Sequence, residues 1–582
     1  MKAQTLGIAA GLLAASLVSA QHAQAFPGFL TSKKPADLKV HSTQVVVLKK
    51  GALTAVTVMP DYEGPIEPFA LVLVVPSDVT EQRVTTLKRD FVDRIDQISA
   101  PRFHEFWEQD PCDPGPLEQE WERVLKADPN GGFLGGGPSP GGGPKVAKEL
   151  SMDVKAKQKE GEYTFSLVGK DESIASFLKG KGYVVPDGAE AAVAPYVQAG
   201  NRLVLAQVDS NRIELVGGER AQLSPIRFWT EQPYDTIPDR VGLLNAPAAP
   251  DKQELLVYVL DPEQRYEVKN YKNLFPPTNI EVDFAVKERV GEFYAALQDM
   301  ILAKNPGSFL LEYAWHGDGC GQPCATDPID ISELLSLGAD VFEQSVPADE
   351  KNPKPPERSK EEEDAFKDTL KDLKPKEKKA KIKADKEDRE TVAARKALVA
   401  RHKYILSRMH YRYDAAALPS DPKIGPAAGA LEGGIWVPEG KDHTVSTETK
   451  PATVSKFQTR YNNFHPWVPV IQCPNPDRYK WGKSPRDYRG LRKTWIAEDL
   501  TRKSRTQIKP AEVVKTAIPW LGLTGAAQPA AADAGADGGT DAGAKKSGKC
   551  GCRVPGGSDS GSPLALIALA TALGFVRRRA RH

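Results

Sequence analysis

The fold class is decided by ten residues, Glu67-Pro68-Phe69-Ala70-Leu71-Val72-Leu73-Val74-Val75-Pro76. The seven central residues are all apolar, and a proline ends the run. A short apolar run with such flanks is typical of a buried strand. The stretch therefore predicts a strand at residues 69–75, and the segments on either side of it predict the structure to which this strand belongs.

The segments next to this run have the patterns of two more strands and a helix. Residues 44–48 and 53–59 are rich in β-formers, and the turn signal Lys49-Lys50-Gly51 separates them. Beyond the run, five apolar residues recur at helical spacing and stop before Pro101. They are Val84, Leu87, Phe91, Ile95 and Ile98. The first block is therefore predicted to run strand, strand, strand, helix.

A second block repeats this alternation. Strands are expected at residues 163–168, 203–208, 254–260 and 309–313. One helix is expected to start at an N-cap on Asp171 and to stop at Gly180, and another covers residues 286–301. Strands joined by short turns, with helices at irregular intervals, predict an α+β fold with a largely antiparallel sheet.

Three low-complexity segments divide the chain. A Gly-rich loop covers 130–144, a densely charged segment covers 351–390, and an Ala/Gly-rich tether precedes the C-terminus. The charged segment cannot form a packed core, so we expect it to be disordered or an extended solvated helix. The expected parts are a signal peptide (1–25), an α+β domain (26–350), a charged insert (351–394), the rest of the structured body (395–521), a tether (522–549) and a sorting tag (550–582).

Composition restricts the classes of partner. Lys and Arg total 78 against 77 Asp and Glu, so no overall basic field would attract nucleic acid. Hydrophobic residues make up 40% of the chain, which is ample for a core. Six cysteines are few for a secreted chain of this length, so any disulfides are expected to be local.

The N-terminus has the pattern of a Sec-type signal peptide. Met1-Lys2 precedes an apolar run at residues 6–18 and the small-x-small sequence Ala23-Gln24-Ala25. We expect signal peptidase to cleave between Ala25 and Phe26. The partners implied are the export machinery and signal peptidase.

The C-terminus resembles the MYXO-CTERM sorting tag of secreted myxobacterial proteins. Cys550 and Cys552 precede an apolar run at residues 563–576 and a basic end formed by Arg577, Arg578, Arg579 and Arg581. Fourteen residues rise about 21 Å as a helix, which is marginal for a hydrocarbon core of about 30 Å. The resemblance implies a transmembrane helix that serves as a signal, a sorting protease as partner, and anchoring in the cell envelope or at the outer surface, with release after processing as an alternative.

The stretch at 67–76 also resembles the "DFAWVLPVP" segment of an uncharacterised secreted family, domain-of-unknown-function family 2330. Supporting segments follow in the expected order at 91–94, 100–103, 182–186, 196–197, 223–228, 311–315 and 406–413. The resemblance spans roughly 40–425. This chain lacks the cysteine-flanked motif that usually opens the family. The family has no established activity, so the resemblance implies a fold and a location but no catalytic residue.

Reactive side chains are densest after the strand at 309–313, in His316, Asp318, Cys320 and Cys324. Structural zinc sites usually have two ligand pairs, and no second pair with suitable spacing is present. Export oxidises thiols. A disulfide between Cys320 and Cys324 is therefore expected, with a metal or thiol site as the alternative.

Three weaker signals remain. His104, Glu105 and Glu108 lack a second histidine at metalloprotease spacing and are interpreted as an amphipathic surface segment. Aromatic and cationic residues alternate over 464–495, a pattern that suits packing across the surface or the binding of a surface polymer. Cys112 and Cys473 are single cysteines that can pair with each other.

Two functions follow from the sequence. The favoured hypothesis is a non-enzymatic binding or structural protein of the cell surface, with no catalytic, cofactor or metal residues. The alternative is a secreted hydrolase or redox protein with a site near His316, Asp318, Cys320 and Cys324. No nucleophile–base pattern or metal constellation selects this alternative.

Overall fold

The computed structural model describes residues 27–112 and 161–525, except 214, 218–219, 249–250, 318, 320–325, 415, 435–437, 440–443, 483–494 and 497–507. The signal-peptide site at Ala25 and Phe26, the disulfide expected between Cys320 and Cys324, and the tag residues Cys550, Cys552, Arg577, Arg578 and Arg579 all lie outside the described residues.

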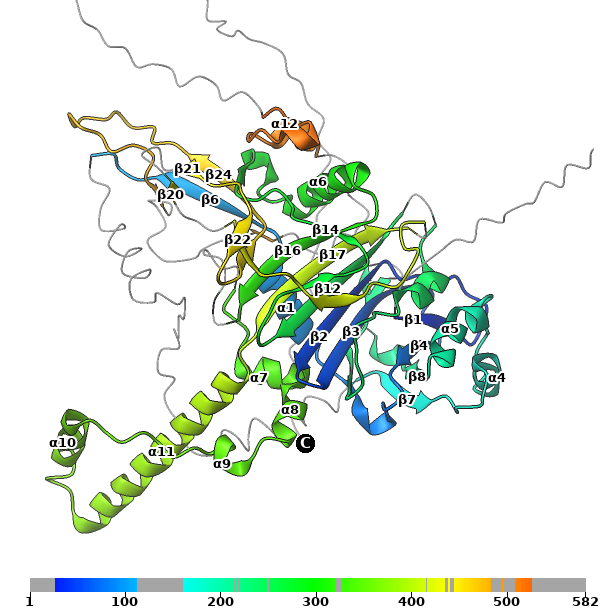
Figure 1. Cartoon of the computed structure of the whole chain (residues 1–582), viewed down its shortest axis with the longest axis horizontal. Coiled ribbons are helices and arrows are strands. Elements are labelled where there is room, and N and C mark those ends of the chain that lie inside the picture. The colour runs from blue at the N-terminus through cyan, green and yellow to red at the C-terminus, as the bar shows by residue number, and fades with distance from the viewer. Residues whose placement is uncertain are drawn as a thin grey trace, which may run out of the picture. The chain divides into compact units, whose positions relative to one another are not determined.

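A large central sheet forms the core of the fold (Figure 1). Its middle strands follow the order β16 (Ser308–His316), β17 (Ile405–Tyr413), β12 (Gln253–Asp261), β2 (Ser42–Lys50) and β3 (Leu53–Glu63). These neighbours are antiparallel except β12 and β2, which run parallel. The sheet continues through β5 (Val84–Thr86), β9 (Leu215–Gly217), β10 (Arg220–Gln222), β11 (Ile226–Thr230), β14 (Lys272–Leu274), β19 (Ala430–Gly433), β22 (Lys450–Ala452) and β23 (Lys456–Gln458).

The predicted strand at 69–75 is β4 (Phe69–Val75), and it lies in a second, four-stranded antiparallel sheet. Its neighbours are β1 (Gly28–Ser32) and β8 (Arg202–Val208), and β7 (Tyr163–Leu167) pairs with β8. All seven residues of β4 are buried. Alternate side chains pack against the central sheet, and those between them pack against helices, so the unbroken apolar run reflects burial on both faces.

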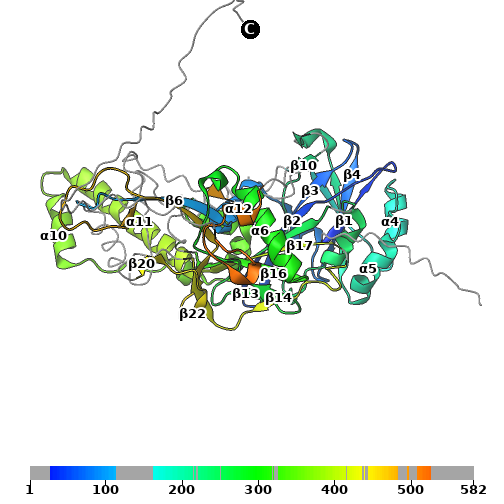
Figure 2. The same ribbon diagram turned by 90° about the horizontal axis from the view of Figure 1, so that it is seen from above.

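Helices cover the outer face of each sheet. α4 (Ile174–Gly180) and α5 (Ala189–Gln198) pack on the four-stranded sheet, and both views place them beside it (Figures 1 and 2). The central sheet is covered by α1 (Asp90–Ser99), α7 (Ile331–Leu334) and α8 (Asp340–Gln344). The layers therefore follow the order helix, sheet, sheet, helix. This arrangement confirms the α+β class with a largely antiparallel sheet.

A third sheet is built on β6 (Arg102–Glu108) and includes late parts of the chain. β6 runs parallel to β24 (Arg460–His465), although more than 350 residues separate them. The remaining strands of this sheet are β15 (Ile280–Glu281), β25 (Trp481–Gly482) and β26 (Trp495–Ile496). α6 (Val290–Lys304) and α12 (Pro510–Val513) belong to the core cluster beside it.

The charged segment is helical, so the expectation of a disordered insert is wrong and the extended solvated helix is the form observed. After α9 (Ala348–Lys351) come α10 (Lys360–Asp368) and the long α11 (Pro375–Arg401), of which only Ala393 is buried. Ser359 and Glu362 form a capping box at the start of α10, and Pro375 at the first turn favours helix initiation in α11. We call residues 359–401 the helical arm.

The remaining elements are short. They are β13 (Tyr266–Val268), β18 (Ile424–Pro426), β20 (Pro438–Glu439), β21 (Thr444–Val445), the 3₁₀ turns η1 (Glu81–Arg83), η2 (Ser210–Arg212), η3 (Asp239–Asn245), η4 (Phe284–Val286) and η6 (Pro519–Leu521), and a π-helical turn η5 (Leu335–Ala339). Among the described residues, no helix combines the length and the apolar character that a membrane crossing requires. The apolar run at 563–576 lies outside them.

Three predicted helix starts are wrong. Val84 lies in strand β5, which pairs with β11, and α1 begins only at Asp90. The N-cap of α4 is Ser173, whose side chain accepts a hydrogen bond from the Ser176 amide, and not Asp171. Val286 belongs to η4 and α6 begins at Val290. In each case the apolar residues are buried as expected. Strand pairing sets the backbone conformation of Val84, whereas local caps at Ser173 and Asp283 mark the other two starts.

Candidate functional site

Charged residues gather on one face of strand β17. Along this strand Arg408, His410 and Arg412 alternate with Met409, Tyr411 and Tyr413. Because side chains alternate across a strand, Met409, Tyr411 and Tyr413 join the core between the two sheets. The three cationic side chains point to the opposite face, where their partners come from β12, β16, α1 and α6.

Glu312 of β16 lies on this face, at a β-bulge. Leu311 is opposite Met409 and Tyr313 is opposite Arg408, so Glu312 is the extra residue of the bulge. The carbonyl of Glu312 accepts a hydrogen bond from the Thr459 amide of the neighbouring segment. A bulge lets two successive residues lie on one face of a strand. Here Glu312 and Tyr313 both lie on the face of the β17 cations, and the carboxylate of Glu312 is beside them.

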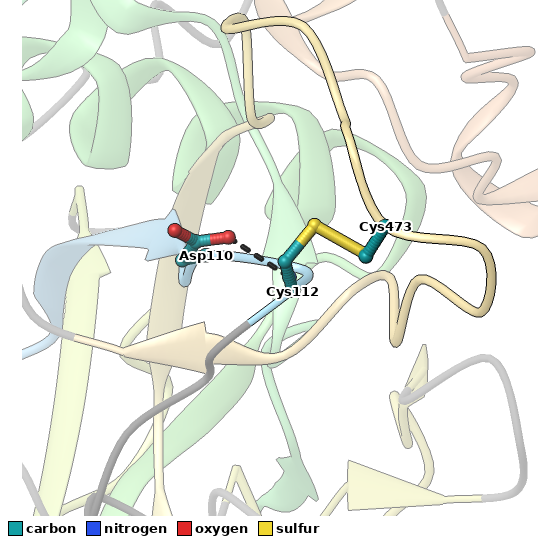
Figure 3. Close-up of a disulfide and its surroundings, with 3 residues drawn as sticks. All are labelled: Asp110, Cys112 and Cys473. Carbon is teal, nitrogen blue, oxygen red and sulfur yellow. Dashed lines mark hydrogen bonds between the residues drawn. A yellow bond between two sulfur atoms is a disulfide. The ribbon is translucent and has the colours of Figure 1, made fainter.

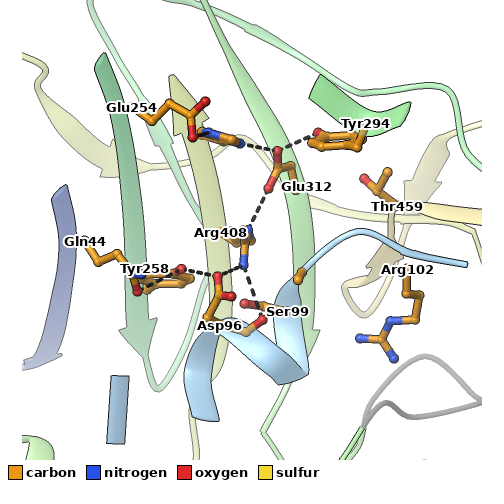
Figure 4. A network of polar contacts seen from close by, with 12 residues as sticks. Gln44, Asp96, Ser99, Arg102, Glu254, Tyr258, Tyr294, Glu312, Arg408 and Thr459 are labelled. Carbon is orange, nitrogen blue, oxygen red and sulfur yellow. Dashed lines mark hydrogen bonds and ion pairs between the residues drawn. The ribbon is translucent and has the colours of Figure 1, made fainter. Parts of the chain in front are cut away.

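Arg408 binds two carboxylates on this face of the sheet (Figure 4). Its Nε donates to Oε2 of Glu312 at 2.6 Å, and its Nη1 donates to Oδ1 of Asp96 at 2.5 Å. Asp96 comes from helix α1, and it also accepts a hydrogen bond of 2.6 Å from the Tyr258 hydroxyl of β12. The guanidinium therefore ties helix α1 to strands β16 and β17.

The other oxygen of Glu312 is occupied as well. Its Oε1 accepts from the Tyr294 hydroxyl of α6 at 2.5 Å and lies 2.7 Å from Nδ1 of His410. Burial opposes ionisation of Glu312, but His410 and Arg408 outweigh it and lower its pKa to about 2. Burial also opposes protonation of His410, yet Glu312 and Glu254 raise its pKa to about 9. The pair is therefore an ion pair at neutral pH.

This ion cluster (Asp96, Glu312, Arg408 and His410) is closed to solvent at its centre. The side chain of Glu312 is 0% exposed, and those of His410 and Arg408 are 2% and 3% exposed. A general acid or base must come within hydrogen-bond reach of a substrate proton. Both oxygens of Glu312 are already engaged by protein donors, so the arrangement stabilises the contacts of α1 and α6 with the sheet.

Sequence patterns missed this cluster, although they contained a usable signal. Glu312 interrupts the apolar part of β16, Glu254 lies directly before the apolar part of β12, and Arg408-x-His410-x-Arg412 places three cations on one strand face. Charged residues inside buried strands are rarely unpaired. Carboxylates in two apolar strands and cations in a third would have predicted buried ion pairs, but not which residues meet.

Two buried arginines lie next to each other in the third sheet. Arg102 of β6 and Arg460 of β24 are register partners, and both are 0% exposed. Arg102 Nη2 donates to the Ile98 carbonyl at 2.5 Å. Burial lowers the pKa of Arg102 to about 10 and that of Arg460 to about 9. Both therefore remain cations at neutral pH.

The segment of His104, Glu105 and Glu108 is a strand of the third sheet and not a surface segment, so that prediction is wrong. Glu105 is 3% exposed and Glu108 is 2% exposed. Glu105 binds Lys287 at 2.7 Å and His465 at 2.9 Å. The acidic residues of this strand are buried because cations from later segments cover them.

Glu108 holds the loop of residues 466–480, which we call the Cys473 loop. Its carboxylate accepts from the Trp467 amide at 2.8 Å, the Tyr479 amide at 2.7 Å and Arg478 Nε at 2.7 Å. Burial opposes ionisation of Glu108, but these donors together lower its pKa. Val468, the residue after Trp467, is 87% exposed.

A disulfide between Cys112 and Cys473 fastens the same loop to the end of β6 (Figure 3). The two Cα atoms lie 5.5 Å apart, within the range for a disulfide. The Cys112 amide also donates to Asp110 at 2.8 Å. The pairing that the sequence left open between these two single cysteines is therefore present, and because it joins residues 361 positions apart the expectation that disulfides are local is wrong for this pair.

Phe464 and His465 pack on strand β6. Phe464 contacts Phe106 at a centroid distance of 5.6 Å and Trp481 at 4.8 Å. His465 stacks on Trp107 at 4.6 Å. Packing across the domain surface describes these residues, whereas Tyr479 is 45% exposed.

The remaining predicted site residues are only partly described. His316 ends strand β16, whereas Asp318, Cys320 and Cys324 lie outside the described residues. Within the described ranges no three His, Cys, Asp or Glu side chains are grouped closely enough to hold a metal ion. A small pocket beside His402 and Phe342 has a volume of about 20 Å³, which is room for about one water molecule.

Comparison with known proteins identifies the family. No curated protein and no solved structure matches this chain significantly. The model of the family described as "Uncharacterized protein conserved in bacteria (DUF2330)" matches residues 21–424. The match includes the four-stranded sheet, the central sheet apart from its late strands β19, β22 and β23, and every residue of the ion cluster, but it ends before Cys473 and the Cys473 loop. Because it covers more than half of the chain, this protein belongs to the DUF2330 family of uncharacterized bacterial proteins.

Proposed function

We propose that this protein is exported and held at the cell envelope by its C-terminal segment, where it acts without catalysis as a binding or structural protein. The observation that carries the proposal is the disulfide between Cys112 and Cys473. Disulfides persist in oxidising compartments outside the cytosol and are rare inside it.

The sequence at both ends supports the same location. An apolar run and the Ala23-Gln24-Ala25 site open the chain, and a Cys-apolar-Arg segment closes it. Arginines after an apolar helix favour the cytoplasmic side, which would leave Cys550 and Cys552 on the exported side for a sorting protease. The tether between the body and these cysteines would separate the folded part from the membrane.

The chemistry of the ion cluster supports a non-enzymatic role. Its charged groups pair with one another: Arg408 binds both Asp96 and Glu312, and His410 binds Glu312 as well. A cluster of this kind stabilises one arrangement of helices and strands. The function would then depend on the surface that this rigid body presents, and a surface polymer is the partner class that we expect.

Cell fractionation combined with mass spectrometry of the purified protein tests the proposal. We expect the protein in the envelope fraction, an N-terminus at or near Phe26, and a Cys112–Cys473 linked peptide that disappears on reduction. A double Cys550→Ser, Cys552→Ser variant should lose its anchoring while retaining the linked peptide. The matched control Ser547→Ala, in the tether, should leave anchoring unchanged.

Two results would overturn the proposal. The first is a cytoplasmic protein that retains Met1 and has free thiols at Cys112 and Cys473. The second is unchanged envelope anchoring of the double cysteine variant, which would exclude the C-terminal cysteines as the processing site.

A further inference from the structure

The helical arm is braced at several points. Arg358 forms ion pairs with Glu363 of α10 and Asp385 of α11, and its guanidinium stacks on Phe366 at 4.0 Å. Arg389 of α11 donates to the Pro356 carbonyl. These contacts join α10, α11 and the segment before them, so the arm presents its side chains in a defined arrangement.

The base of the arm is fixed to the layered core. Arg401, the last residue of α11, donates to Glu343 of α8 through Nε at 3.0 Å and Nη2 at 2.9 Å. His402 lies 2.8 Å from the same carboxylate. Strand β17 follows within a few residues, so α11 is continuous with the central sheet.

The first half of α11 is strongly basic. Seven lysines lie between residues 374 and 386, against two acidic residues. Four of these lysines, at i, i+3, i+7 and i+10, share one face of the helix. They are Lys376, Lys379, Lys383 and Lys386, and all four are exposed. We call them the lysine row, and at 1.5 Å per residue it is about 15 Å long.

The acidic residues of this region leave the row positive. Glu377 caps the helix by accepting from the Lys374 amide, and Asp385 pairs with Arg358, so both are engaged away from the row. Lys383 and Lys386 approach Glu387 and Glu390 at 3.7 and 3.8 Å, in pairs that are largely exposed. Exposed pairs of this geometry are weak, so an anionic partner can replace them.

We propose that the lysine row binds an anionic polysaccharide whose carboxylates repeat along an extended chain. A straight row of hydrated ammonium groups suits a linear polyanion, because Lys supplies point charges without a demand for bidentate geometry. A helix that lies in a membrane needs a broad apolar face. Within the described segment 374–386 the one large apolar residue is Ile382, which is 49% exposed, so the lipid surface is disfavoured. The inference rests on the proposed surface location.

Binding of the full mature chain to polygalacturonate, measured by isothermal titration calorimetry, tests the inference. We expect binding at low salt that is lost at high salt, and no binding to uncharged dextran. Changing all four lysines of the row to Gln should weaken binding at least about tenfold. Gln has nearly the same helix propensity as Lys, and circular dichroism of the variant should retain the helical signal.

A matched control removes the same charge from elsewhere in this region. Lys354, Lys360, Lys367 and Lys371 are also exposed, and the last two pair with Asp or Glu within a turn. Their fourfold change to Gln should leave the affinity within about twofold, because exposed charges off the row add only weak screened attraction.

Three results would overturn the inference. They are failure of the native chain to bind polygalacturonate, an equal loss of affinity in the control, and row-dependent binding that occurs only to phosphatidylglycerol vesicles or to a second copy of the chain. The outcome is separate from the proposed function, because a cytoplasmic location found by fractionation would overturn that proposal without changing this binding measurement.

Discussion

The ion cluster of the central sheet and the helical arm use the same residue types in opposite environments. In the cluster Arg408 reaches Glu312 at 2.6 Å and both side chains are at most 3% exposed. In the arm Lys383 approaches Glu387 at 3.7 Å, and these side chains are 77% and 41% exposed. The first pair holds layers of the protein together, whereas the second leaves its charges available to solvent.

The difference teaches that burial, and not the number of ion pairs, decides what a charge does here. A buried charge loses its hydration, and close partners of opposite charge must compensate for that loss. Removing one partner therefore strongly lowers the free energy of unfolding. An exposed charge remains hydrated, and its pairing is worth about 0–1 kcal/mol. The cluster is therefore suited to stability, and the arm is suited to exchangeable contacts with a partner.

The largest effect is expected from Glu312→Ala. The change leaves Arg408 and His410 buried without their shared carboxylate and removes the acceptor of the Tyr294 hydroxyl. We expect the free energy of unfolding to fall by about 3–5 kcal/mol, measured by urea denaturation at pH 7. A loss below about 1 kcal/mol would show that the buried cluster behaves like the exposed arm.

A second test concerns a buried carboxylate that forms no ion pair with a cation of the described residues. Asp239 is 0% exposed, accepts a hydrogen bond of 2.9 Å from the Tyr413 hydroxyl, and burial raises its pKa to about 8. Because this folded-state value lies above the unfolded value of 3.8, the stability that it contributes is fully present below about pH 4 and is lost as the pH rises toward 8.

Asp239→Asn should remove this dependence. Relative to the native chain, the variant should gain stability by up to about 1.4 kcal/mol per pH unit between about pH 4 and 8, with no further gain above that range. Urea denaturation at pH 5, 6, 7 and 8.5 measures the difference. A constant difference at all four values would contradict the raised pKa.

Glu343 tests an intermediate degree of burial, because it joins the arm to the core and its side chain is 15% exposed. Glu343→Gln weakens the charge-assisted bonds to Arg401 and His402. We expect a loss of about 1–2 kcal/mol in the free energy of unfolding. Trypsin should also cleave α11 faster in this variant, and unchanged cleavage would mean that the arm does not depend on this junction.

The smallest effect is expected on the exposed surface of the arm. Glu387→Gln removes the partner of Lys383 on α11. The free energy of unfolding should change by less than about 0.5 kcal/mol, measured under the same conditions as for Glu312→Ala. A loss of stability comparable to that of Glu312→Ala would show that exposed and buried ion pairs contribute equally in this protein.

Local sequence patterns were sufficient for much of the layered core. The apolar run of β4, the turn at Gly51 between β2 and β3, and the strands β8, β12 and β16 were all predictable, because burial on one or both faces imposes a pattern within a few residues. Boundaries such as the start of α1 failed because Val84 is equally apolar in a helix or in a strand, and its pairing with Phe228 decides between them.

The sequence by itself determined which segments are apolar strands, that the segment after Lys351 cannot form a core, and that Cys112 and Cys473 are able to pair. Only the tertiary structure decided that β6 pairs with β24, that Cys112 meets Cys473, and that Glu312 meets Arg408 and His410. The physical reason is the sequence distance between the partners. Periodicity and turn chemistry act between near neighbours in the chain, whereas these buried charges and the disulfide have partners from 96 to 361 positions away, which meet only when the layers have packed.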